Sequence, residues 1–177
     1  MSCLARLRAR QLLARSQTTA RVACAIVCLA MDDDTEALLV RADAFPLLVA
    51  ALRLHISVDL VVDPVARALQ NLSSQAHHKP IALGVGVLPA AVDALSRPER
   101  TAVSVKPLAD LIHVLASHRP PSGSGGVRAE LERTGAPGVV SGLIGRYRAL
   151  GDSDSEAAVA ALSDLQLALE DLWRAAE

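Results

Sequence analysis

Hydrophobic residues recur at helical spacing along this chain, and the pattern returns every 43 residues. Val22, Ile26 and Leu29 are four and three residues apart, so they share one face of a helix. The same set recurs one period later and again after a second period, at Val65, Leu69 and Leu72 and at Leu108, Ile112 and Leu115. The pattern predicts one long helix in each unit, with these residues as its buried stripe.

Polar junctions and prolines divide the chain between the long helices. Each junction, at 31–35, 73–79 and 117–126, is followed by a short apolar segment and a break at Pro46, Pro89 or Pro137. Pro64 and Pro107 fall in the expected first turn of a long helix, where a proline loses no hydrogen bond. Each unit is therefore predicted to contain a short helix, a sharp turn, a second helix, a loop and the long helix.

The repeat defines the expected domain organisation. A period of about 40–47 residues is typical of two- or three-helix solenoid units, so we expect one all-α domain over 1–177. Its parts are a partial first repeat at 1–31, repeats at 32–75 and 76–118, a flexible loop at 119–126 and a last repeat at 127–177. Helix caps are expected from Asp32 onward and from glycines in the breaks, such as Gly86 and Gly135.

Composition agrees with helices and gives no strong preference for a charged partner. The chain is 51% hydrophobic but 2% aromatic, which favours helices rich in Ala and Leu over sheets. The net charge of −1 gives no reason to expect nucleic-acid binding, and no apolar run reaches the roughly 20 residues of a membrane span. Three cysteines near one end favour a reducing compartment, so a cytoplasmic or nuclear location is expected.

The N-terminal 31 residues contain five arginines and no acidic residue. This composition is shared by mitochondrial transit peptides, in which case the first 20–30 residues are removed. The same stretch keeps the period of the repeat, which favours a structural helix. Its basic face, with Arg6, Arg10 and Arg21, is expected to be solvated, although it could also contact an acidic partner.

Other candidate chemistry is weak, and no enzyme, metal site or cofactor is expected. Cys24 and Cys28 have helical spacing but no matching second pair of ligands, so they are predicted to be small residues on the groove side. Gly84 and Gly86 are expected to form a turn rather than a phosphate-binding loop. The histidines are expected at the surface: His77, His78, His113 and His118.

The middle of the chain resembles an armadillo repeat. The resemblance rests on three segments, which are 68–74 (ALQNLSS), 79–81 (KPI) and 86–95 (GVLPAAVDAL), and His78 stands where the family usually has Asn. It is best over about 64–95 and weaker in the flanking units. The resemblance implies a right-handed superhelix in which the long third helices line a concave groove.

In armadillo proteins that carry nuclear import cargo, a ladder of Trp and Asn residues lines that groove. The Trp positions would be Cys24, Arg67, Asp110 and Ala160, and the Asn positions would be Cys28, Asn71, Val114 and Asp164. Every Trp is missing, so the resemblance argues against an import receptor. Asn71 either binds a peptide backbone, as the family does, or caps the end of its own helix.

We therefore expect a scaffold that binds a partner protein or extended peptide along the groove. The expected contact residues lie in the two middle units, and they are Arg67, Gln70, Asn71, Ser74, Asp110, His113 and Ser117. The alternative is a structural or oligomerisation segment without a groove ligand. In that case an apolar edge at Leu4, Leu7 and Leu12 would pack against another chain or further repeats.

Overall fold

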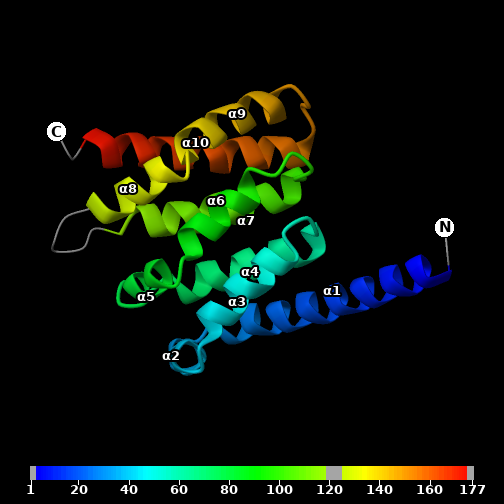
Figure 1. Ribbon diagram of the computed structural model, residues 1–177. Helices are drawn as coiled ribbons and strands as arrows, with labels where there is room; N and C mark the ends of the chain where they lie inside the picture. The colour runs from blue at the N-terminus through cyan, green and yellow to red at the C-terminus, as the bar shows by residue number, and fades with distance from the viewer. Residues whose placement is uncertain (1–2, 119–124, 175–177) are drawn as a thin grey trace.

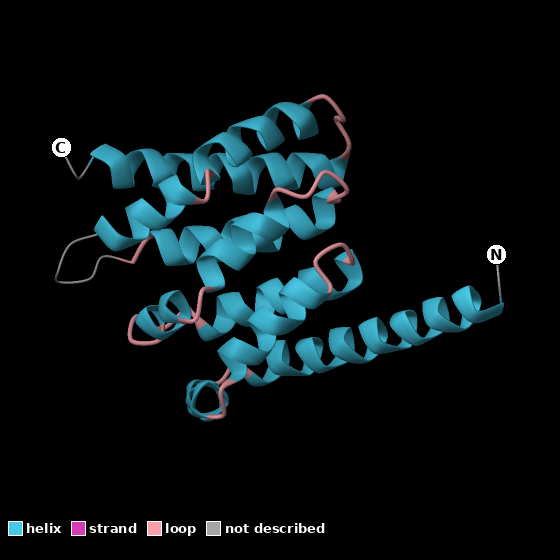
Figure 2. Cartoon of the chain, in the orientation of Figure 1, coloured by secondary structure: helices cyan, strands magenta, loops and turns pink. Residues whose placement is uncertain are grey.

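The computed structural model describes residues 3–118 and 125–174, with side chains from residue 14 onward. The regular secondary structure of this part of the chain consists of helices without a strand, which confirms the predicted all-α class (Figure 2). The helices, in order, are α1 (Cys3–Leu29), α2 (Asp33–Arg41), α3 (Ala44–Leu54), α4 (Asp59–Leu72), α5 (Lys79–Gly84), α6 (Val87–Leu95), α7 (Ala102–Ala116), α8 (Gly125–Arg133), α9 (Ala136–Arg148) and α10 (Ser153–Arg174).

The four long helices α1, α4, α7 and α10 lie side by side in chain order (Figure 1). α4 packs between α1 and α7, and α7 packs between α4 and α10. A second row of helices covers three of them, because α3 packs on α4, α6 on α7 and α9 on α10. The N-terminal part of α1 projects beyond the end of α4 (Figure 1).

The predicted buried stripe is confirmed in α4, α7 and α10. Val65, Leu69 and Leu72 are completely buried, and so are the corresponding residues Leu108, Ile112 and Leu115 of α7 and Ala158, Leu162 and Leu165 of α10. These side chains lie under the second row of helices. Burial of each Val, Leu or Ile side chain among them contributes roughly 1.5–3 kcal/mol relative to its exposed state.

The same prediction is wrong for α1. Val22 is 54% exposed and Leu29 is 49% exposed, whereas Ala20 and Ala23 are buried. The reason is that α1 packs extensively against α4 alone among the described helices, and it does so through its alanine face. A stripe is buried only where a second helix covers it.

Pro64 and Pro107 do not mark the first turns of their helices. α4 begins at Asp59 and α7 at Ala102, so both prolines lie inside a helix. Both helices start earlier than predicted, and the start of α7 is fixed by the hydrogen bond from the amide of its N-cap residue Thr101 to Asp59. A proline has no N–H to donate to the carbonyl four residues before it, which here is that of Leu60 or Val103.

The sharp turns before α3, α6 and α9 have left-handed backbone conformations. φ is 80° at Gly86 and 70° at Gly135, as predicted for glycines at these breaks, and 57° at Asp43, where a side chain adds strain. The predicted cap at Asp32 is confirmed, because its carboxylate accepts a hydrogen bond of 3.0 Å from the Thr35 amide at the start of α2.

Two sequence predictions concern segments that lie wholly or partly outside the described residues. The predicted loop 119–126 is too long at its end, because α8 begins at Gly125, and 119–124 lie outside the described residues. The predicted apolar edge at Leu4, Leu7 and Leu12 also lies outside the described side chains. No described helix is long and apolar enough to cross a membrane.

Candidate functional site

A cavity of about 810 Å³ spans α1, α4 and α7, and no residue of the second-row helices lines it. Three of its lining residues, Gln17, Leu60 and Val103, occupy the same position in successive units, 43 residues apart. Two further pairs keep this spacing: Ala20 with Asp63, and Arg21 with Pro64. The cavity is therefore formed by equivalent positions of three neighbouring long helices.

The cavity combines exposed apolar side chains with polar groups. Leu60 is 57% exposed and Val103 is 55% exposed, although both lie on helices that are otherwise well buried. Pro64 also lines the wall and leaves the carbonyl of Leu60 without its usual helical donor. The cavity can therefore offer a ligand both apolar contact and a hydrogen-bond acceptor.

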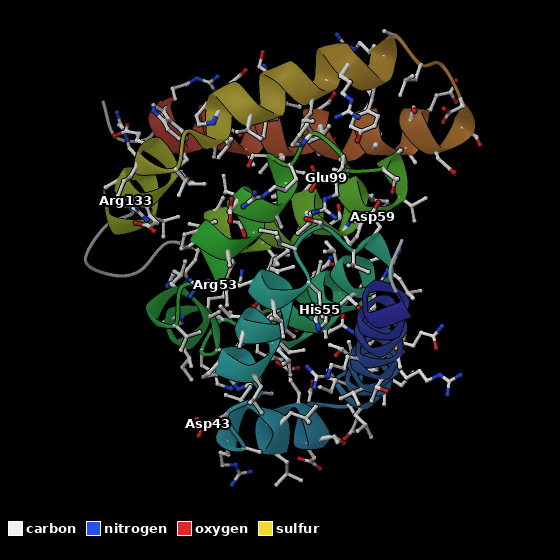
Figure 3. All side chains as sticks on the ribbon, turned by 45° about the vertical axis from the view of Figure 1, so that its right-hand side comes forward. Asp43, Arg53, His55, Asp59, Glu99 and Arg133 are labelled. Atoms are coloured by element: carbon white, nitrogen blue, oxygen red, sulfur yellow. The ribbon has the colours of Figure 1, made fainter. Side chains whose placement is uncertain are left out.

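Asp59 forms the polar end of the cavity and joins α4 to α7. Its carboxylate accepts hydrogen bonds from the Thr101 amide at 3.1 Å and the Thr101 hydroxyl at 2.5 Å, immediately before α7 begins. It also pairs with the guanidinium of Arg100. Figure 3 shows Asp59 next to the loop that carries Glu99. The carboxylate thus acts as a cap for a helix in the next unit.

The ionised form of Asp59 is favoured. Partial burial opposes ionisation, but the hydrogen bond from Thr101 and the positive charge of Arg100 together outweigh it, so the pKa of Asp59 is lowered from its ordinary value of 3.8. The cavity therefore contains a carboxylate that is negatively charged at neutral pH and already engaged by two neighbours.

Arg100 lies completely buried behind the cavity and connects three units. Its Nε donates to the Ala94 carbonyl at 3.0 Å, and its terminal nitrogens donate to the Ile56 carbonyl and to Asp59. The hydroxyl of Tyr147, from α9, donates to the Arg100 carbonyl at 2.6 Å. Burial raises the pKa of Tyr147, which keeps this hydroxyl protonated as a donor. Arg100 is therefore a structural joint rather than a ligand-facing residue.

The predicted contact residues of α4 share one face, but they do not line the cavity. Arg67 is exposed and pairs with Asp63 at 3.1 Å, and Asp63 does line the cavity. Gln70 is half-buried, and Ser74 is exposed just beyond the end of the helix. The cavity thus begins about one turn before the predicted residues, toward the start of α4.

Asn71 does not cap the end of its own helix, which was one of its two expected roles. Its Nδ2 donates at 3.2 Å to the carbonyl of Val27, in the last turn of α1. Carbonyls in the last turn of a helix lack an intrahelical partner, so Asn71 satisfies one that belongs to the neighbouring unit. The side chain links two long helices.

The predicted residues of α7 lie on the face equivalent to that of α4. Asp110 pairs with Lys106 at 2.7 Å, His113 is half-buried, and Ser117 is exposed. The Ser117 hydroxyl accepts a hydrogen bond of 3.4 Å from Lys79 and donates to the Val114 carbonyl at 2.8 Å. The structure therefore places both predicted sets on adjacent helices, next to the cavity rather than in it.

The expectation that the histidines lie at the surface is wrong for His78. Its ring is 4% exposed, and its Nδ1 lies 2.7 Å from a carboxylate oxygen of Glu36, which is also buried. His77 is exposed, whereas His113 and His118 are half-buried. His78 and Glu36 are 42 residues apart and link two units, so the period itself was the signal that could have paired them.

Sequence reasoning missed the cavity, Asp59 and Arg100. A single Arg beside a Thr gives no sign of burial, and Asp59 precedes the predicted start of its helix. Of the two cysteines predicted on the groove side, Cys24 lines the cavity and Cys28 is exposed outside it. The described side chains include no group of three or more His, Cys, Asp and Glu that could hold a metal ion.

Comparison with known proteins places the chain in no family: no protein-family model matches it, and no curated protein matches it significantly.

Proposed function

We propose that this chain is an armadillo-like binding module that holds an extended peptide segment of a partner protein across α1, α4 and α7. The observation that carries the proposal is the cavity formed by Gln17, Leu60 and Val103, one from each of three successive units. Equivalent positions in stacked repeats repeat at regular intervals along a surface. Such a surface suits a ligand that is itself extended.

The chemistry of the wall indicates what the peptide should offer. Leu60 and Val103 provide apolar contact, and the carbonyl that Pro64 leaves without a helical donor can accept a backbone N–H. Asp63 can exchange Arg67 for a basic side chain of the peptide, because an exposed i,i+4 pair contributes only about 0.3–0.5 kcal/mol. We therefore propose a segment with aliphatic side chains and at least one Lys or Arg.

The predicted residues Arg67, Gln70 and Asn71 continue this surface toward the end of α4. A peptide longer than the cavity would reach them next, followed by Asp110 and His113 on α7. The cavity is thus proposed as the anchor, and these residues as its extension. A compartment that keeps Cys24 reduced, such as the cytoplasm, suits this site.

The test is selection of peptides from a random library on the immobilised chain, followed by measurement of their affinity by fluorescence anisotropy. Replacing Leu60 and Val103 together with Glu should weaken binding at least about tenfold, because both contacts would become charged. Leu167→Glu is the matched control, since Leu167 is 60% exposed on α10, away from the cavity. Equal affinity for the cavity variant and the control would contradict the proposal.

Cys24 provides a second readout at the same site. In a variant with Cys3→Ser and Cys28→Ser, the thiol of Cys24 is the only one left for alkylation. A bound peptide should slow the alkylation of Cys24. In the complementary variant, which retains Cys28 alone, protection should be weaker because Cys28 does not line the cavity.

A further inference from the structure

One face of α1 has the composition of a buried stripe but is not covered. Val22 and Leu29 are about half exposed, whereas their equivalents Val65 and Leu72 on α4 are completely buried. Ile26, between them, is only partly buried. The same positions are covered on α4 by α3, on α7 by α6 and on α10 by α9.

This face is distinct from the two other faces of α1. With about 100° per residue, Val22, Ile26 and Leu29 lie within about 60° of one another on the helix circumference. The buried face against α4 (Ala20, Ala23 and Ala30) and the cavity face (Gln17, Arg21 and Cys24) lie on other sides of the helix. A molecule bound to the stripe would therefore leave the cavity open.

We infer that the face of α1 formed by Val22, Ile26 and Leu29 is a self-association surface, on which α1 of a second copy of this chain packs in antiparallel orientation. Such a contact is isologous, so the surface must complement itself under a two-fold rotation. The face of α1 meets this requirement in shape and in charge.

The apolar residues are self-complementary. A two-fold axis near Ala25 and Ile26 places Val22 of one copy against Leu29 of the other, and the reverse contact follows by symmetry. Ala25 is small and exposed, which allows the two helices to approach closely at the axis. Each copy would thereby cover the stripe of the other, as α3 covers that of α4.

The charges select the antiparallel orientation. α1 contains arginines and no acidic residue, whereas Asp32, Asp33 and Asp34 follow its end directly. Arg15 is exposed on the stripe side, two turns or about 10 Å before Val22. In antiparallel packing, Arg15 lies beyond Leu29 of the second copy, beside the aspartates of that copy. Parallel packing would instead set arginines beside arginines.

Arg15 and Asp34 are both available for this pair. Asp32 caps α2, and Asp33 accepts a hydrogen bond from Gln75 at 3.0 Å. Asp34 and Arg15 are exposed, and the described side chains include no ion-pair partner for either. In the proposed contact, Arg15 of one copy pairs with Asp34 of the other.

The test is the mass of the full chain in solution, measured by light scattering and by sedimentation equilibrium across a concentration series. The wild type should form a dimer, and Val22→Asp combined with Leu29→Asp should shift it to a monomer with unchanged helical circular dichroism. Leu167→Asp, an equally exposed leucine on α10, is the matched control and should remain dimeric. A wild type that stays monomeric up to about 100 μM, a concentration at which weak specific contacts are occupied, would overturn the inference.

Charge reversal tests the orientation separately. Arg15→Glu and Asp34→Arg should each weaken the dimer, whereas the double variant should restore it, because a two-fold contact pairs each changed residue with the other. A double variant no tighter than the single ones would overturn the antiparallel arrangement. Because these residues do not line the cavity, peptide binding by the monomeric variant separates this inference from the proposed function.

Discussion

α1 and α7 pack against opposite sides of α4, yet the two contacts are built differently. The α4–α7 contact contains the buried guanidinium of Arg100, the carboxylate of Asp59 and completely buried aliphatic side chains. The α1–α4 contact uses small residues such as Ala20 and Ala23, with the hydrogen bond from Asn71 to the Val27 carbonyl at one end. Ser16 and His55, 3.2 Å apart, link α1 instead to the residue that follows α3.

The comparison shows that a hydrophobic stripe specifies a helix but not its stability. α1 and α7 carry equivalent stripes, but only that of α7 lies beneath another helix. The central contact is stabilised from both rows of helices, whereas α1 depends on one. The stability of this chain should therefore be concentrated around α4 and α7.

Replacement of Arg100 should destabilise the α4–α7 contact and so remove its difference from the α1–α4 contact. Arg100→Ala leaves Asp59 without its cationic partner and three carbonyls or carboxylates without their donor, at a cost of about 3 kcal/mol or more in the free energy of unfolding. Urea denaturation measures this cost. Arg174→Ala, which removes an exposed pair with Asp171, is the control and should cost less than about 1 kcal/mol. Equal losses would mean that Arg100 is not a joint.

Equivalent leucines on the uncovered stripe of α1 and the covered stripe of α4 give the most direct comparison. Leu72→Ala should cost about 2–5 kcal/mol because the side chain is completely buried. Leu29→Ala, one period earlier, should cost no more than about 0.5 kcal/mol at concentrations where the chain is monomeric, because surface substitutions seldom cost more. Both values come from thermal or urea unfolding. A similar cost at both positions would show that α1 is covered in the monomer.

The smallest expected effect is on the pH dependence of stability, and it comes from Asp59. The pKa of Asp59 is lower in the folded chain than in the unfolded one, so its contribution is present above the ordinary value of 3.8 and is lost as pH falls through the lower folded value. Asp59→Asn should therefore reduce the loss of stability below about pH 4, as measured by urea unfolding at successive pH values. An equal loss of stability in the wild type and in the variant as pH falls would contradict this prediction.

The helical class and the stripes of α4, α7 and α10 could be predicted because helical periodicity depends on the local sequence. The exposure of Val22 and Leu29 could not, since burial depends on which helices are present to cover a face. The positions of Pro64 and Pro107 inside helices also escaped prediction. For α7 the reason is that its start is fixed by a hydrogen bond from Thr101 to Asp59, which belongs to another unit. The armadillo-like arrangement remains a proposal.

The predicted contact residues and the cavity lie on the same two helices, α4 and α7, at different positions along them. Arg67 and Asn71 were chosen by analogy with groove positions, whereas the cavity lies around Leu60 and Val103, nearer the helix starts. Its depth depends on how α1, α4 and α7 diverge, which no single helix encodes. Arg100 escaped prediction because its burial requires acceptors from Ile56, Asp59 and Ala94 at once.

The joint at Arg100 also has a consequence for motion. Arg100 connects residues from three units. The amide hydrogens of α4, α6 and α7 should therefore exchange with solvent only when much of the chain opens. Among the described helices α1 packs extensively only on α4, so its amides should exchange through local detachment, well before the rest. The chain would then be loosest at its first helix, which forms one wall of the cavity, and a ligand bound there would slow exchange in α1 most.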